Sequence, residues 1–136
     1  FGPNDTRPKV FNLWQNIART GETLEMSAGD QVIDISYIDD IVNAYRILAD
    51  HLQNNTESIV NGSVFAVNAN IRYTLKELAS IFEQSTGSKL NINWGGRKYG
   101  EREVMEPWTG GILVPGWRQQ VSIEEGIKSI KKKIHL

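Results

Sequence analysis

The feature that most constrains the fold is the irregular alternation of amphipathic helical segments with short, apolar extended stretches. Apolar residues at helical spacing predict a helix over Val10–Thr20, with Gly21 just after its end. Three more helices are expected: from Asp39 or Asp40 to about Leu52, from Thr74 to Thr86 before Gly87, and from Ser122 into the run Lys131–Lys133. Strands are expected at Leu24–Met26, Val32–Ile38, Ser63–Asn68 and Leu90–Trp94. This pattern predicts an α/β fold, α+β-like in its irregularity, rather than a complete doubly wound sheet.

The helix starts carry local signals of their own. Thr74 with Glu77, and Ser122 with Glu125, form capping boxes, in which the two side chains satisfy each other's backbone donors. The pair Asp39–Asp40 is expected to cap the second helix rather than to bind a metal ion, because adjacent side chains at a helix start point in different directions. The stripe expected to be buried on that helix comprises Ile41, Ala44, Tyr45, Leu48 and Leu52.

Residues 95–117 form the longest stretch without a helical or strand pattern. The stretch is rich in glycine, proline and charged residues. Loops of this length inside a compact domain are usually functional or mobile.

Composition excludes several classes of function. A chain of 136 residues fits one domain. It has no cysteine and only two histidines, so neither a disulfide, a thiolate metal site nor a multi-histidine zinc centre is expected. A net charge of −1 gives no field that would attract nucleic acid or an anionic membrane. No apolar run approaches the ~20 residues that span a bilayer and no export signal is visible, so a cytoplasmic location is expected.

Residue patterns for stand-alone catalysis are also missing from the sequence. It contains neither a G-x-G-x-x-G nor a Walker motif, and the pair Gly95–Gly96 follows a predicted strand without opening a helix. No Tyr-x-x-x-Lys pair occurs, and no nucleophile stands beside an obvious base. We therefore assign no catalytic, cofactor-binding or metal-binding residue to this chain. The opening Phe1-Gly2-Pro3 suggests a piece of a longer protein.

Four ordered segments carry a resemblance to a known family. Phe1-Gly2-Pro3-x-Asp5 with Lys9-Val10-Phe11 is similar to a Tyr-Gly-Pro … Lys-Leu-Ile segment, and residues 21–44 (GETLEMSAGDQVIDISYIDDIVNA) to G-E-x-L … G-x-Q-x-R-D-F-x-Y-V-D-D-V-V-x-A. Residues 67–78 and 115–127 resemble the motifs N-x-G … S-x-x-E-L and L-G-W-x-P-x-x-S-L-E-E-G-L. Together they resemble the extended short-chain dehydrogenases/reductases, which are NAD(P)-dependent nucleotide-sugar epimerases, dehydratases and reductases. The segment 99–108 (YGEREVMEPW) most resembles bacterial members that include deoxysugar reductases.

The resemblance implies that residues 1–136 are the C-terminal, substrate-binding region of such an enzyme. The Rossmann domain, with the NAD or NADP site and the catalytic Tyr-x-x-x-Lys, would precede it in the parent protein. The helix from Asp39 to Leu52 and a neighbouring strand would pack on that absent domain. The isolated chain is then expected to be inactive, and its uncovered apolar surface to favour a homodimer. The alternative is a non-catalytic ligand-binding or assembly module derived from the same lobe.

The resemblance also implies which residues contact the nucleotide-diphosphate sugar. Lys9 and Arg102 match family positions that approach the diphosphate, while Arg97 and Asn70 are further candidates. Each could instead be an ordinary solvated loop group. Ile33 stands where the family has an arginine, which removes one expected diphosphate contact and suggests packing in its place. Three tryptophans are expected to pack in the core or between lobes rather than to stack on a base: Trp94, Trp108 and Trp117.

Overall fold

The computed structural model describes residues 1–54 and 62–131. Its elements, in chain order, are α1 (Val10–Thr20), β1 (Leu24–Met26), β2 (Val32–Ile33), α2 (Ile38–Gln53), β3 (Phe65–Ala66), β4 (Tyr73–Thr74), α3 (Leu75–Thr86), β5 (Ile92–Trp94), β6 (Ile112–Leu113) and α4 (Ile123–Lys131). The strands form three two-stranded sheets, namely parallel β1–β5, antiparallel β2–β4 and parallel β3–β6. The mixed helix and strand class predicted from the sequence is confirmed.

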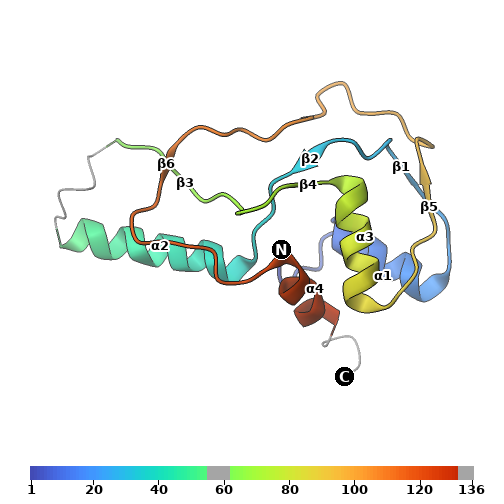
Figure 1. The fold of residues 1–136 in the computed structure, drawn as a ribbon, viewed down its shortest axis with the longest axis horizontal. Coiled ribbons are helices and arrows are strands. Elements are labelled where there is room, and N and C mark those ends of the chain that lie inside the picture. Colours follow the sequence, from blue (N-terminus) through green and yellow to red (C-terminus); the bar gives the residue numbers. More distant parts are fainter. Residues whose placement is uncertain (55–61, 132–136) are drawn as a thin grey trace.

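The molecule has a packed region and an extension (Figure 1). Helices α1, α3 and α4 gather with β1 and β5 on one side, whereas α2, β3 and β6 reach away from them. The β2–β4 pair lies between the two parts, and residues 95–111 cross back from β5 to β6.

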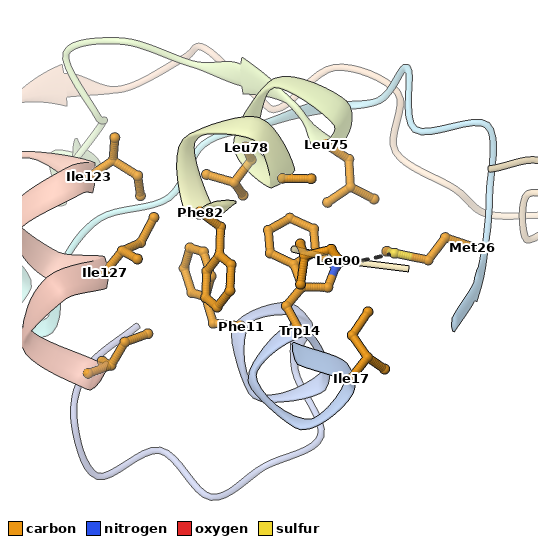
Figure 2. Packing of buried hydrophobic residues seen from close by; sticks show 12 residues of the cluster. Phe11, Trp14, Ile17, Met26, Leu75, Leu78, Phe82, Leu90, Ile123 and Ile127 are labelled. Atoms are coloured by element: carbon orange, nitrogen blue, oxygen red, sulfur yellow. Dashed lines mark hydrogen bonds between the residues drawn. The ribbon is translucent and has the colours of Figure 1, made fainter. Parts of the chain in front are cut away.

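The core lies between α1, α3 and α4 (Figure 2). Trp14, Leu78 and Ile127 have no exposed surface, and Phe82 is 1% exposed. The Phe11 and Phe82 rings stack with centroids 6.1 Å apart, while Trp14 meets Phe82 edge-on at 5.6 Å. The Trp14 Nε1–H also donates a hydrogen bond to Met26 Sδ over 3.4 Å, which ties α1 to β1. The helix predicted over Val10–Thr20 is thus confirmed, and three of its apolar residues are buried: Phe11, Trp14 and Ile17.

Both capping boxes are confirmed. Thr74 Oγ1 accepts a hydrogen bond from Glu77 N (3.2 Å), and the Glu77 carboxylate accepts one from Thr74 N (2.7 Å). Ser122 and Glu125 make the same reciprocal pair. Gly21 and Gly87 adopt the left-handed conformation that ends α1 and α3, with φ of 76° and 66°. Of the lysine run predicted to end the last helix, residues 132 and 133 lie outside the described residues.

The predicted strand bounds were too generous, and two strands were missed. Residues 34–37 are not in a strand, and the segments around β3 and β5 shorten to 65–66 and 92–94. Strands β4 and β6 occur where no strand was predicted, β6 inside the expected loop. Strands of two residues carry too little alternation to be recognised in the sequence. Their pairing depends on partners 40 to 47 positions away, as in Val32 with Thr74 and Phe65 with Ile112.

The predicted cap of the second helix is wrong. Helix α2 begins at Ile38 after Tyr37, and no side chain caps it. Asp40 is instead 2% exposed, and its carboxylate accepts hydrogen bonds from Gln120 N (2.9 Å) and Val121 N (3.1 Å). The Trp117 indole N–H donates to Asp40 O over 2.9 Å, so α2 is fastened to residues 117–121 rather than capped.

The predicted burial of the α2 stripe is only partly correct. Ala44 is buried, but Tyr45 is 72% and Leu52 57% exposed. Val42 on the same helix is 58% exposed. Helix α2 therefore presents an apolar surface that nothing in the described chain covers.

Candidate functional site

The long segment predicted as a loop is tied along much of its length to another loop. Residues 95–105 run beside residues 26–32, and we call these two segments the paired loops. The N–H groups of Gly95 and Arg97 both donate to Met26 O, over 3.0 and 3.1 Å, and Val32 N donates to Met105 O over 2.8 Å. Main-chain hydrogen bonds therefore hold both ends of the segment that carries Arg97 and Arg102.

Side chains join the paired loops between these ends. The Tyr99 hydroxyl accepts a hydrogen bond from Asp30 N over 3.0 Å. Gln31 is 4% exposed, and its Nε2 donates to Ser27 Oγ (3.1 Å) and to Glu103 Oε1 (3.5 Å). These contacts fix the position of a segment whose sequence indicated only an irregular loop.

Gly29 permits this close approach. Its φ of +82° is a conformation that favours glycine, and a Cβ atom there would lie 2.6 Å from the Trp94 ring. Lys76 closes the same turn from α3, with its Nζ 3.2 Å from Asp30 Oδ1.

The arginines divide into those with partners and those without. Arg7, Arg19, Arg46 and Arg72 each bond to a nearby side-chain oxygen. Arg7 holds the pKa of Asp5 far below its usual range by hydrogen bonding to its carboxylate. Within the described part of the chain, Arg97, Arg102 and Arg118 make no side-chain hydrogen bond or ion pair. Two of these three unpaired guanidinium groups lie on the paired loops and are exposed to solvent.

The four residues expected to contact substrate do not form one cluster. Lys9 precedes α1, is exposed, and lines a cavity of about 20 Å³ with Phe1 and Ile130. Asn70 is exposed, its backbone N–H donates to Gln119 Oε1 over 2.8 Å, and it lines a cavity of about 310 Å³. Only Arg97 and Arg102 share a structural unit, the paired loops.

The largest cavity described here contains none of the four candidates. It has a volume of about 620 Å³ and lies between α1 and the C-terminal end of α3, where Gln15, Arg19 and Thr86 line it. The 310 Å³ cavity includes Tyr73 and Glu124, and burial followed by the negative charge of Glu124 raises the pKa of Tyr73.

Ile33 packs where an arginine was expected. It is half-buried against the core, as predicted. The neighbouring Asp34 carboxylate accepts hydrogen bonds from Ala69 N (2.9 Å) and Arg72 Nε (2.8 Å). Neither partner of Asp34 was recognised from the sequence, because both lie at least 35 positions away.

The three tryptophans expected to pack have different surroundings. Trp94 packs against the core, and Trp117 is half-buried beside α2. Trp108 is 65% exposed, so it is not a core residue of this chain. Its ring lies so close to Gly110 that a Cβ atom could not fit between them.

Among residues 1–54 and 62–131, no group of three His, Cys, Asp or Glu side chains is placed to hold a metal ion. The pair Gly95–Gly96 follows β5 but leads into the paired loops, so it offers no helix N-terminus to a dinucleotide pyrophosphate. No described helix combines the length and apolar character needed to cross a membrane.

Comparison with known proteins shows that the chain is similar in sequence to part of two longer proteins. The chain is 29% identical over 109 residues to a CDP-abequose synthase of Yersinia pseudotuberculosis, covering 79% of this chain and 36% of that protein. It is 27% identical over 133 residues to a CDP-abequose synthase of Salmonella muenchen, covering 96% of this chain and 43% of that one. No protein-family model matches the chain.

Solved structures agree over the whole chain. A variant of the UDP-glucuronic acid 4-epimerase of Bacillus cereus, in complex with a UDP-sugar and NAD, superposes with a TM-score of 0.81 at 18% identity. The alignment covers 99% of this chain and 42% of the epimerase. A UDP-glucose 4-epimerase of Thermotoga maritima gives 0.72 at 22% identity, covering 99% and 43%. The chain has the fold of the C-terminal part of an extended short-chain dehydrogenase/reductase. The resemblance seen in the sequence is therefore confirmed, and the chain spans about two fifths of these relatives.

Proposed function

We propose that this chain is the substrate-binding, C-terminal region of an NAD(P)-dependent enzyme that modifies a nucleotide-diphosphate sugar by epimerisation, dehydration or reduction. The observation that carries this proposal is the superposition of 99% of the chain on 42% of a UDP-sugar epimerase. The two sequence relatives, both named for a CDP-sugar, favour a cytidine diphosphate sugar.

The exposed apolar side chains of α2 and β6 support the proposal that another domain packs against this chain. Val42, Tyr45 and Leu52 on α2 are more than half exposed, and so are Ile112 and Leu113 on β6. Exposed apolar side chains that recur along one helix, like the three on α2, mark a surface that meets another protein part. In the parent protein an N-terminal Rossmann domain would cover them and supply the hydride chemistry of NAD or NADP. The separate chain would instead form a homodimer through them.

The paired loops support the role of the two arginines. A guanidinium group makes two parallel hydrogen bonds to phosphate oxygens, and a group without an internal partner breaks no existing bond in doing so. Arg102 would bind the diphosphate, with Arg97 on the same loop as its neighbour. Lys9 and Asn70 lie outside the paired loops and line two separate cavities, from which each would contact another part of the ligand.

Nucleotide binding to the separate chain tests the proposal. Titration of the ¹⁵N-labelled chain with CDP, followed by NMR, should give weak binding, with a Kd on the order of 1 mM because half of the site is absent. Arg102→Ala should weaken it about tenfold, as expected for the loss of a charge-assisted contact. Lys89→Ala removes the same charge from an exposed position outside the three cavities and should leave the affinity unchanged.

Activity assays test whether the separate chain lacks hydride-transfer activity. The chain mixed with CDP- or UDP-sugars should neither oxidise NADH or NADPH nor reduce NAD or NADP. Measurable turnover would contradict the proposal, and so would equal losses of CDP affinity in the Arg102→Ala and Lys89→Ala variants.

A further inference from the structure

The turn that carries Arg102 is closed by its own neighbour, Glu103. Glu103 N donates to Gly100 O over 3.0 Å, and Glu103 Oε2 accepts from Gly100 N over 3.3 Å. The other carboxylate oxygen, Oε1, accepts from Gln31 Nε2 over 3.5 Å. Both oxygens of Glu103 are thus engaged, one inside the turn and one on the opposite loop.

The two hydrogen bonds of Glu103 affect the guanidinium group of the adjacent Arg102. Arg102 lies between Glu101 and Glu103, yet within residues 1–54 and 62–131 it forms no ion pair. A carboxylate held by two N–H donors is less available to the arginine beside it. An internal ion pair would have to be broken before Arg102 could bind an anion, and its absence leaves the group open.

The partner of Glu103 belongs to the packed region of the molecule. Gln31 is 4% exposed, its side chain is also bonded to Ser27, and its carbonyl oxygen accepts from Leu75 N over 3.1 Å at the start of α3. Because Gln31 is bonded to the start of α3, its hydrogen bond to Glu103 holds the turn 100–103 in place relative to α3. A group held in its binding geometry loses less conformational entropy when the ligand arrives.

We propose that Glu103 is a positioning residue: it fixes the turn 100–103 against Gln31 and keeps its own carboxylate away from Arg102, which stays open to a diphosphate. The diphosphate part of this inference rests on the proposed function. Glu103 itself does not touch the ligand, since a carboxylate would repel it.

Two substitutions with the same change in charge test the inference. Glu103→Gln removes the negative charge and keeps one of the two oxygens that accept hydrogen bonds, whereas Glu103→Leu removes the charge and both acceptors. In the ligand-free ¹⁵N-labelled chain, backbone order parameters of residues 100–103 should fall only slightly in Glu103→Gln, which keeps one acceptor, and much further in Glu103→Leu. The CDP Kd should stay within about twofold in the first variant and rise about fivefold in the second, as for one net hydrogen bond.

Combination with Arg102→Ala separates positioning from a general loss of structure. In that background Glu103→Leu should not weaken CDP binding further, because the group it positions is gone. Identical order parameters in the two Glu103 variants would overturn the positioning role. So would a fivefold loss on Glu103→Leu that persists without Arg102. If the order parameters differ as expected but Arg102→Ala leaves CDP binding unchanged, the positioning stands and the proposed diphosphate contact is refuted.

Discussion

Replacing Asp40 with asparagine should destabilise the chain far more than the same change at its neighbour Asp39. Asp40 is 2% exposed, and its two carboxylate oxygens accept hydrogen bonds from Gln120 N and Val121 N. Asp39 is exposed, and no hydrogen bond to its side chain occurs in the described structure. The two substitutions therefore make the same chemical change in opposite surroundings.

The magnitude follows from the bonds that are lost. An asparagine at position 40 keeps one oxygen and turns an amide group toward the second backbone N–H, which is left without an acceptor. A hydrogen bond to a charged group contributes about 1.5–3 kcal/mol, and a buried donor without a partner costs a similar amount. Asparagine also removes the cost of burying a charge, so we expect a net loss of about 2 kcal/mol in the free energy of unfolding. With a urea dependence of about 1.5 kcal/mol per M, the midpoint should fall by about 1.3 M.

Urea unfolding followed by circular dichroism and by tryptophan fluorescence measures this change. Trp117 reports directly, because its indole donates to Asp40 O. Asp39→Asn should shift the midpoint by less than about 0.3 M, as surface changes usually do. Equal midpoints for the two variants would refute the claim that Asp40 ties α2 to residues 117–121.

Three further changes have expected outcomes. Gly29→Ala should lower the free energy of unfolding, measured with urea, by about 2 kcal/mol or more, because Gly29 has a positive φ and lies close to an aromatic ring. Gly21→Ala, at φ +76° with open space around it, should lower it by only about 1 kcal/mol. Thr74→Ala should cost about 1 kcal/mol. Hydrogen bonds from Thr74 lower the pKa of Glu77 from 4.5. The stabilisation by this cap is therefore present above pH 4.5 and is lost as the pH falls through the lowered pKa. Measured against pH, the Tm values of the Thr74→Ala variant and the unsubstituted chain should converge in acid. Tyr45→Lys, at a position 72% exposed, should weaken self-association in sedimentation velocity without changing Tm; an unchanged sedimentation profile would place any self-association elsewhere.

Local chemistry made part of this fold predictable. The capping box of Thr74 and Glu77 fixes the start of α3 within four residues of chain, and Gly21 and Gly87 mark helix ends for the same reason. The apolar spacing of α1 likewise found its buried residues, because a helix face is a local property.

The remaining features depend on distant partners. Asp40 resembled a helix cap because its bonded partners lie 80 and 81 positions away. Spacing identified the apolar residues of α2, but it could not show that Tyr45 would stay exposed in this chain. Within the candidate site, Arg102 was expected from resemblance alone, whereas the contact of Gln31 with Glu103 spans 72 positions and leaves no pattern in the sequence.

A crystal structure of the chain grown with CDP would test the central claim most directly. The account predicts the diphosphate against the paired loops, with its oxygens within hydrogen-bond distance of the Arg102 guanidinium group and with Glu103 still bonded to Gln31. Density for CDP only in the cavity between α1 and α3, or an Arg102 side chain paired with Glu101 and no diphosphate beside it, would contradict the account.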